Sequence, residues 1–205
     1  MAEEADFDAI VVGAGIAGCI AAYELAQAGK AVLVVERGNY AGAKNMTGGR
    51  IYIHSLKKVF PDCETEAPLE RKICHERISL MAPDSNFTID FSSDEMEKED
   101  QASYSVLQAP FDQWLAQKAE DVGAEFIYGI PVEGLVKDES GRVCGVKAGE
   151  DEITAQIVIL CDGANSLLAK EAVGYDTPPA SQIAVSVKEV FQLDEKTIED
   201  RLLCN

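Results

Sequence analysis

One unit near the N-terminus, residues 7–36, constrains the fold of this chain more than any other stretch. An apolar run at residues 7–12 leads into Gly-Ala-Gly-Ile-Ala-Gly at residues 13–18, a helix rich in small residues is predicted from about Ala17 to Ala28, and a second apolar run ends at Glu36. The pattern is that of a strand–turn–helix–strand unit. Glycines in this spacing permit a tight turn, a close approach of backbone to phosphate, and close packing of a helix on a strand. The helix N-terminus offers free N–H groups and partial positive charge to an anion. The unit therefore predicts a Rossmann-like dinucleotide site, and a glycine-rich turn in some other α/β fold is the alternative.

Five residues of this unit are predicted to hold the dinucleotide. The glycine turn and the start of the helix would contact the pyrophosphate, and a carboxylate at the end of the second strand can accept hydrogen bonds from both ribose hydroxyls. These residues are Gly13, Gly15, Ala17, Gly18 and Glu36.

Composition narrows the ligands and partners. The net charge of −18 argues against nucleic-acid binding and against an electrostatic grip on anionic lipid. No apolar run approaches the roughly 18 residues of a membrane-spanning helix, and the acidic start MAEEAD is unlike a secretory signal, which favours a cytoplasmic location. The six cysteines form no C-x-x-C pair and the two histidines are isolated. We therefore predict neither a metal site nor an iron–sulfur centre in this chain.

The middle of the chain decides between classes of dinucleotide. Residues 110–122 have the spacing of an amphipathic helix and residues 124–128 that of a strand. Three short strands follow at residues 132–137, 142–148 and 152–155, joined by turns suited to hairpins. Simple NAD domains usually cross over with a helix at this point, and an antiparallel meander resembles the crossover of large FAD-dependent flavoproteins.

The remaining elements are predicted from shorter patterns. Before the amphipathic helix, strands are expected at residues 79–81, 87–91 and 104–107. After the meander we expect a fully buried strand of a parallel sheet at 157–161, a helix at 166–173, a strand at 183–191 and a helix at 195–202.

Five segments, in order, carry a resemblance to a known family. They read VVGAGIAG…VVERG, GAKNMTGGRIY, YSVLQAPFDQWLAQKAEDVGAE, VILCDGANSLLA and VSVKEV…IEDR. Together they resemble, nearly end to end, the FixC-type flavoproteins of the electron-transfer-flavoprotein–quinone oxidoreductase family. The first and fourth segments are shared by many FAD enzymes, including geranylgeranyl reductases, whereas the second and fifth are more specific to FixC-type proteins.

The resemblance implies that the dinucleotide is FAD, and it assigns further contacts. Arg37 would flank the adenosine, the backbone of Val132 would meet the adenine, and Asp162 with Gly163 would lie near the pyrophosphate. Gln108 stands where related proteins often have arginine, so a contact with the pyrophosphate would persist without a charge. The loop along the flavin side of the cofactor would contribute Lys44, Asn45, Thr47, Gly48, Gly49 and Arg50.

Some of these residues can also be explained without a cofactor. The basic side chains Arg37, Lys44 and Arg50 are also what a solvated loop would carry. Asp162 precedes a predicted helix, where an aspartate can serve only as an N-terminal cap. Both readings stay open at this point.

Pattern and resemblance together predict an α/β fold, with a Rossmann-like, three-layer FAD-binding domain, an antiparallel β-meander crossover, and the first strands of a second α+β domain. Residues 1–50 and 105–178 are assigned to the FAD-binding domain. Residues 51–104 and 179–205 are assigned to an incomplete substrate- or quinone-side domain. FixC-type proteins are considerably longer than this chain, so we expect an N-terminal fragment that keeps the ADP-binding half of the site and is inactive alone.

The implied activity is an electron relay. FAD would accept electrons from the subunits of reduced electron-transfer flavoprotein and pass them to quinone or to a ferredoxin-like protein. The flavin carries this chemistry, so no catalytic side chain is assigned. The part beyond this chain would make any peripheral contact with the inner face of the membrane. The alternatives are a geranylgeranyl reductase-like FAD reductase, a flavin hydroxylase and, for the fragment, a non-catalytic FAD/ADP-binding module.

Overall fold

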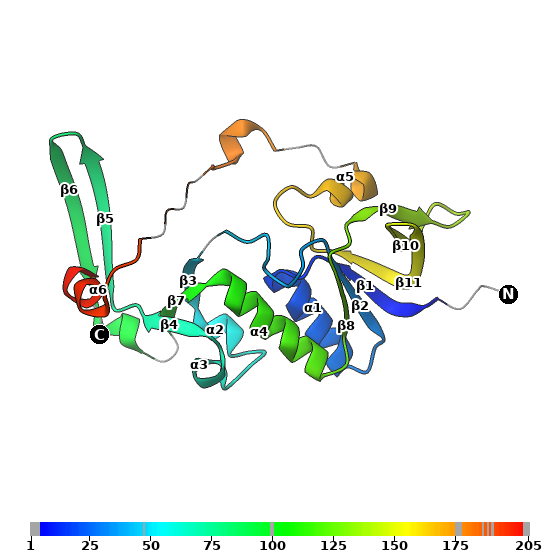
Figure 1. Ribbon diagram of the computed structural model, residues 1–205, viewed down its shortest axis with the longest axis horizontal. Helices are drawn as coiled ribbons and strands as arrows, with labels where there is room; N and C mark the ends of the chain where they lie inside the picture. The colour runs from blue at the N-terminus through cyan, green and yellow to red at the C-terminus, as the bar shows by residue number, and fades with distance from the viewer. Residues whose placement is uncertain are drawn as a thin grey trace. The chain divides into compact units, whose positions relative to one another are not determined.

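Figure 1 shows a computed structural model of the chain, which describes residues 5–46, 48–98, 101–174, 178–185, 187, 189 and 191–202. The chain divides into two compact units, each of which is built from two segments of the sequence. Unit 1 contains Met1–Met46 with Ala109–Ser186, and unit 2 contains Thr47–Gln108 with Val187–Asn205.

Unit 1 is built on a six-stranded mixed sheet in the order β8-β2-β1-β11-β10-β9. The first four strands in this order are parallel, and the last three form an antiparallel meander that shares β11. The strands are β1 (Phe7–Val12), β2 (Val32–Glu36), β8 (Glu125–Tyr128), β9 (Val132–Lys137), β10 (Val143–Ala148) and β11 (Asp151–Leu160). The predicted strand–turn–helix–strand unit and the predicted meander are both present.

Strand β11 corrects two predictions. The segments expected as separate strands at 152–155 and 157–161 form one strand, because its first half pairs with β10 and its second half pairs with β1. A strand that changes neighbours halfway along needs no break in its backbone. The second half is also not fully buried, since Ile157 is 54% exposed. The apolar run indicated cover on both faces, but the helix α1 (Ile16–Gln27) packs over β1 and β2 instead.

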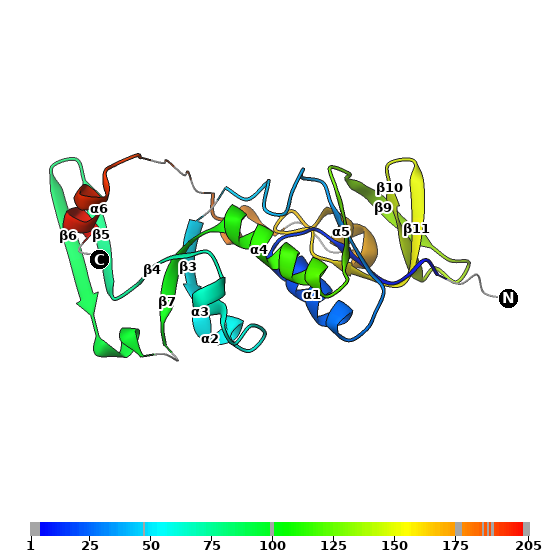
Figure 2. The same cartoon turned by 60° about the horizontal axis from the view of Figure 1, so that its bottom comes forward.

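Three helices accompany this sheet. In α1, small residues allow close packing on β1, and in α4 (Gln108–Asp121) the apolar residues fall on one face. Helix α4 begins before Pro110, which is tolerated in the first turn because no intrahelical N–H is needed there. Figures 1 and 2 both show α1 and α4 side by side. The short helix α5 (Leu167–Val173) packs near β9, where Glu171 accepts a hydrogen bond from the backbone of Leu135.

The core of unit 1 lies on both faces of β1 and β2. Val11 and Val34 are fully buried on the face that α1 covers. The opposite face carries a cluster made of Ile10, Val12, Leu33, Val35, Val146, Ala148, Ala155 and Leu168. Burial on both faces explains why these two strands read as continuous apolar runs.

Unit 2 consists of short elements around two small antiparallel sheets. One sheet has the order β3-β7-β4 and the other is the hairpin of β5 and β6. Its elements are β3 (Gly48–Tyr52), α2 (Ile53–Leu56), α3 (Cys63–Glu66), β4 (Leu69–Lys72), β5 (His75–Ala82), β6 (Ser85–Ser92), β7 (Ser103–Leu107) and α6 (Glu195–Leu202). The short 3₁₀ turns are Asp94–Glu97 in unit 2 and Ala180–Gln182 in unit 1. Strands β5 and β6 are longer than predicted because the hairpin ladder extends them in both directions from the turn.

The strand predicted at residues 183–191 is wrong for the residues described there. Residues 183–185, 187, 189 and 191 have no strand assignment, and Val185 and Val187 are 92% and 95% exposed. Alternation of apolar and polar residues favours a strand only where a neighbouring strand supplies hydrogen bonds. Residues 186, 188 and 190 lie outside the described residues. Within the described ranges, no helix combines the length and apolar character that crossing a membrane requires.

Candidate dinucleotide-binding site

The glycine turn after β1 contains two glycines that the fold requires and one that it does not. An added Cβ at Gly13, whose φ is +101°, would lie 2.5 Å from the carbonyl oxygen of Cys161. At Gly18 it would lie 1.8 Å from the carbonyl oxygen of Gly13. At Gly15 nothing stands within 4 Å of the added atom. Gly13 and Gly18 therefore allow strand, turn and helix to meet, whereas Gly15 keeps an open space beside the backbone.

Helix α1 begins directly beside this space. Gly15 is its N-cap and no side chain caps the first N–H groups. The first turn holds no acidic residue, and Ala17 is exposed there. Unpaired N–H groups and the positive end of the helix dipole suit an anion such as a pyrophosphate.

Glu36 joins three segments at the end of β2. Its Oε2 accepts a hydrogen bond from the N–H of Ala14 at 2.8 Å, and its Oε1 accepts one from the N–H of Gly38 at 2.6 Å. A carboxylate has lone pairs beyond these two bonds, so ribose hydroxyls can still be accepted. The sequence indicated the ribose contact but not that Glu36 also fastens the glycine turn to β2.

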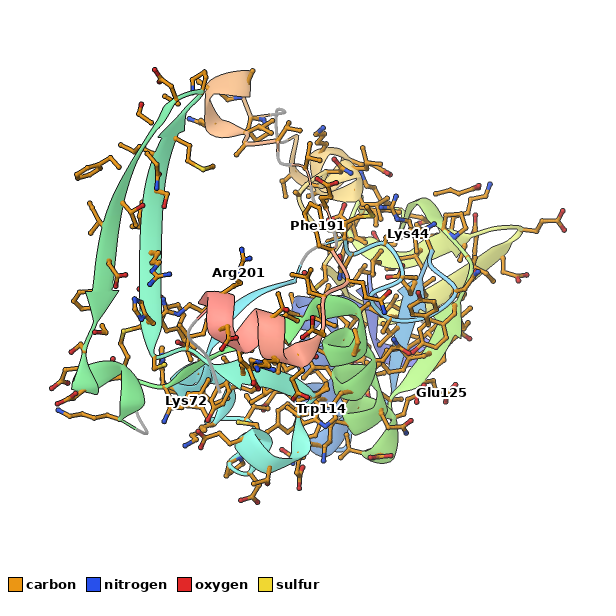
Figure 3. The ribbon with its side chains drawn as sticks, turned by 60° about the vertical axis from the view of Figure 1, so that its left-hand side comes forward. Lys44, Lys72, Trp114, Glu125, Phe191 and Arg201 are labelled. Carbon is orange, nitrogen blue, oxygen red and sulfur yellow. The ribbon has the colours of Figure 1, made fainter. Side chains whose placement is uncertain are left out.

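The loop after Glu36 is held on α4. An added Cβ at Gly42, whose φ is +81°, would lie 2.9 Å from Cα of Ala109. The side-chain amide of Asn45 donates a hydrogen bond to Oδ2 of Asp112, and its backbone N–H donates to the carbonyl of Gly42 at 2.9 Å. Arg37 and Lys44 are exposed on this loop, and Figure 3 labels Lys44 there.

Asp112 is a feature that sequence reasoning missed. Its side chain is fully buried, and Oδ1 has no hydrogen-bond partner among the described residues. Burial, together with the charge of Glu36, raises the pKa of Asp112 to about 6 against the hydrogen bond from Asn45. Burial also raises the pKa of Cys19 to about 12, with Asp112 and Glu36 adding to the effect. The available signal was the position of Asp112 among Leu115, Ala116 and Ala119 on the buried face of α4.

Asp162 and Gly163 lie at the same end of the sheet as the glycine turn. Cys161, just before them, donates its N–H to the carbonyl of Val12 at 2.8 Å, which places the start of this segment beside Gly13. Oδ2 of Asp162 accepts a hydrogen bond from the N–H of Leu168 at 2.9 Å, so the residue does cap an N–H group in the first turn of α5, although Ser166 is the N-cap residue. The second carboxylate oxygen is not used by that bond. Capping and a role near the pyrophosphate are therefore compatible.

Val132 is brought close to the end of β2 by the segment that leads into β9. The N–H of Gly129 donates to the carbonyl of Gly38 at 2.8 Å, and the N–H of Ile130 donates to the carbonyl of Glu36 at 3.2 Å. Val132 follows two residues later as the first residue of β9. Unit 1 thus brings the glycine turn, Glu36, Asp162 and this segment together at the carboxyl end of its parallel strands.

The other predicted contacts belong to unit 2. Gly48 and Gly49 are exposed in β3, and Gln108 is half-buried at the start of α4. Arg50 is engaged within unit 2: its guanidinium pairs with Glu76 at 2.7 Å, donates to Oγ of Ser103 at 2.8 Å and lies over the ring of Tyr52. Thr47 lies outside the described residues. Among the described residues, no group of three or more His, Cys, Asp or Glu side chains is placed to hold a metal ion.

Comparisons with known proteins agree with this geometry. The family described as FAD binding domain matches residues 6–196. FixC of Salmonella typhi is 49% identical over 195 residues, which cover 95% of this chain and 45% of that protein. The probable electron transfer flavoprotein-quinone oxidoreductase YdiS of Escherichia coli (strain K12) is 47% identical over the same shares. The chain thus spans just under half the length of the curated relatives it matches.

Solved structures confirm the fold class. A geranylgeranyl bacteriochlorophyll reductase-like protein from Thermoplasma acidophilum superposes with a TM-score of 0.66 at 25% identity, over 82% of this chain and 42% of that chain. The predicted α/β fold, seen as a six-stranded mixed sheet with small antiparallel sheets, is confirmed. The predicted resemblance to FixC and to electron-transfer-flavoprotein–quinone oxidoreductases is confirmed as well. With an open glycine turn, an uncapped helix and a match over nearly its whole length, the chain belongs to the family of FAD-binding domains.

Proposed function

We propose that this chain supplies the FAD-binding part of an oxidoreductase that takes electrons from electron-transfer flavoprotein and passes them to quinone. The observation that carries the proposal is the open space at Gly15 beside the uncapped N-terminus of α1, with Glu36 at the end of the next strand. Relatives named as FixC and as electron transfer flavoprotein-quinone oxidoreductases support the choice of reaction.

Residues of this chain would bind and orient FAD. Gly13, Gly15, Ala17 and Gly18 would surround the pyrophosphate, and Glu36 would accept hydrogen bonds from the adenosine ribose. FAD, when bound, supplies the electron-accepting chemistry. Further contacts are proposed for Arg37, Lys44, Asn45, Thr47, Gly48, Gly49, Arg50, Gln108, Val132, Asp162 and Gly163.

We also propose the predicted division into domains. Residues 1–50 and 105–178 would form the FAD-binding domain, and residues 51–104 and 179–205 would belong to the substrate- or quinone-side domain. The partners would be the subunits of electron-transfer flavoprotein, quinone and a ferredoxin-like protein. The location would be the cytoplasm, at the inner face of the membrane where quinone is met.

A flavin-retention experiment tests the binding role. The purified chain is mixed with FAD, desalted, and scanned for flavin absorbance near about 450 nm. The wild-type chain should keep the flavin. Gly15→Ala should lose it with little change in melting temperature, because the new methyl group fills ligand space and meets no protein atom.

Gly134→Ala is the matched control, since this glycine lies in β9 and an added Cβ there meets only an oxygen of Glu171 at 3.9 Å. It should keep the flavin. A wild-type chain that keeps no flavin after refolding in excess FAD would contradict the binding role. Equal retention by Gly15→Ala would contradict the placement of the pyrophosphate.

A second candidate is an FAD reductase of prenyl double bonds. The structural likeness to the geranylgeranyl bacteriochlorophyll reductase-like protein favours it. A preparation extended to the full length of the relatives distinguishes the two. Quinone-dependent oxidation of reduced electron-transfer flavoprotein supports the first function, and saturation of a prenyl chain supports the second.

A further inference from the structure

A buried carboxyl group, that of Asp112 in α4, lies near the candidate site, and no cation among the described residues is placed to balance its charge. Asp112 is 0% exposed, Asn45 donates to its Oδ2, and its Oδ1 has no partner among the described residues. A buried carboxylate with an unsatisfied oxygen is costly, and the protein lowers that cost when the group takes up a proton. A buried charged residue on an otherwise apolar helix face is costly, which indicates that it has a function.

Asp112 connects the two segments that border the glycine turn. On one side, Gly42 packs against it so closely that an added Cβ would lie 3.0 Å from Cβ of Asp112, and Asn45 bonds its carboxylate. On the other side, the thiol of Cys19 in α1 lies 3.9 Å from the carbonyl oxygen of Asp112 and 3.5 Å from that of Ala14. The thiol of Cys19 therefore links the backbone of α4 at Asp112 to the backbone of the glycine turn.

The groups around Asp112 make its charge sensitive to an anion at that turn. Among the described residues, the ionisable groups that face it are Cys19 from α1 and Glu36 from the end of β2, while the loop contributes the neutral amide of Asn45. Glu36 bonds the N–H of Ala14, so its charge lies at the glycine turn too. A pyrophosphate there would add two further negative charges close to these groups.

We propose that Asp112 is a positioning residue for the dinucleotide, and that it takes up a proton when the anionic pyrophosphate binds. This inference rests on the proposed function. The bond to Asn45 fixes the loop after Glu36 on α4, and neutralising the carboxyl group removes its repulsion of the ligand. Binding and protonation favour each other by the same factor, because coupling between two ligands of one protein is reciprocal.

Calorimetry with FAD tests the proton uptake. The pyrophosphate diester of FAD keeps its charges across the pH range used, so a proton taken up on binding belongs to the protein. Titrations at about pH 6.5 in two buffers of different ionisation enthalpy give the number of protons bound. If the ligand raises the pKa of Asp112 by about one unit, the wild-type chain takes up about half a proton per FAD. It also binds FAD several-fold more tightly at about pH 5.5 than at about pH 7.5.

Three variants separate the charge from the hydrogen bond. Asp112→Asn can still accept from Asn45, so it should bind FAD with an affinity that does not change over this pH range and without that proton uptake. Asp112→Ala releases Asn45 and should bind FAD more weakly at every pH. Asp121→Asn removes the same charge at an exposed position of α4 and should behave as wild type.

The outcomes distinguish this inference from the proposed function. Absence of FAD binding to the wild-type chain at every pH overturns the proposed function, and this inference with it. FAD binding without proton uptake, or with the same uptake in Asp112→Asn, overturns the inference alone. Equal FAD affinity of Asp112→Ala and Asp112→Asn at low pH overturns the positioning role.

Discussion

Strands β1 and β2 of unit 1 and the hairpin β5–β6 of unit 2 follow equally regular patterns but reach opposite degrees of burial. Val11 and Val34 are 0% exposed, whereas Phe87 and Ile89 in the hairpin are 61% and 54% exposed. The hairpin has an unbroken ladder of eight residue pairs. Local pairing is therefore enough to form strands, and burial requires helices whose surfaces fit the sheet.

The hairpin still has two distinct faces. Its apolar face carries Ile78, Leu80, Phe87, Ile89 and Phe91. Across the other face, Arg77 pairs with Asp90 at 2.7 Å and Ser79 bonds Thr88 at 2.9 Å. Figure 3 shows these strands with side chains standing off the ribbon on both faces. Polar pairs and a tight turn thus support the register here, where burial supports it in unit 1.

The largest effect is expected where a helix is pressed onto the buried sheet. Gly18→Ala places a methyl group 1.8 Å from a backbone oxygen and must push α1 away from β1. We expect the free energy of unfolding of unit 1 to fall by more than about 4 kcal/mol, or the unit not to fold. Urea denaturation followed by far-ultraviolet circular dichroism measures this.

Gly15→Ala is the control for that prediction, since the same methyl group meets open space three residues earlier. It should change the free energy of unfolding by less than about 1 kcal/mol. Helix propensity favours alanine over glycine at Gly18. A similar loss for both variants would therefore contradict the view that the close contact of Gly18 with the glycine turn is what requires a glycine there.

The next prediction compares the two regions directly. Ile10→Ala empties a fully buried position in β1 and should lower the free energy of unfolding by about 3 kcal/mol. Ile89→Ala removes the same atoms from a 54% exposed position in β6 and should lower it by less than about 0.5 kcal/mol. Chemical denaturation of the two variants under one condition gives the difference. Equal losses would show that the hairpin is covered in solution.

The two regions also differ in how far their structure could be predicted from the sequence. The unit from Phe7 to Glu36 was predictable because its strands, turn and helix are each specified by neighbouring residues. The continuity of β11 was not, because only the pairing with β1 and β10 decides whether residues 152–155 and 157–161 are one strand. Residues 183–191 have the pattern of a strand, but those described there have no strand neighbour.

Parts of the candidate site were visible in the sequence for the same reason. Glycine spacing and the acidic residue that ends β2 are local signals, and the structure gathers Gly13, Gly15 and Glu36 around one turn. The burial of Asp112 was not predicted, because a charged residue in a helix is usually solvated. The bonding of Arg50 within unit 2 depends on Glu76 and Ser103, which no short window contains.

A smaller effect is expected at the polar exception inside the buried region. In the folded chain the pKa of Asp112 is about 6, above its ordinary value of 3.8. The folded state therefore holds this proton more tightly, so the stability from this group is fully present below about pH 4 and is lost as the pH rises through 6.

The stability of Asp112→Asn relative to wild type should therefore increase by about 2 kcal/mol between about pH 4.5 and about pH 7.5. Denaturation curves at both pH values, with Asp121→Asn alongside, measure the difference. A constant gap between Asp112→Asn and wild type across this range would show that Asp112 does not titrate there.

The smallest effect belongs to Asp162, at the edge where the buried sheet meets an exposed turn. Asp162→Ala removes the acceptor for the N–H of Leu168 and should lower the free energy of unfolding by about 1 kcal/mol. Asp162→Asn keeps an acceptor there and should lie within about 0.5 kcal/mol of wild type.

Flavin retention by these two variants then separates the capping role of Asp162 from a contact with the ligand. If Asp162 only caps α5, both variants keep FAD in proportion to their stability. A loss of FAD from Asp162→Asn at unchanged stability would instead show that the carboxylate acts on the cofactor.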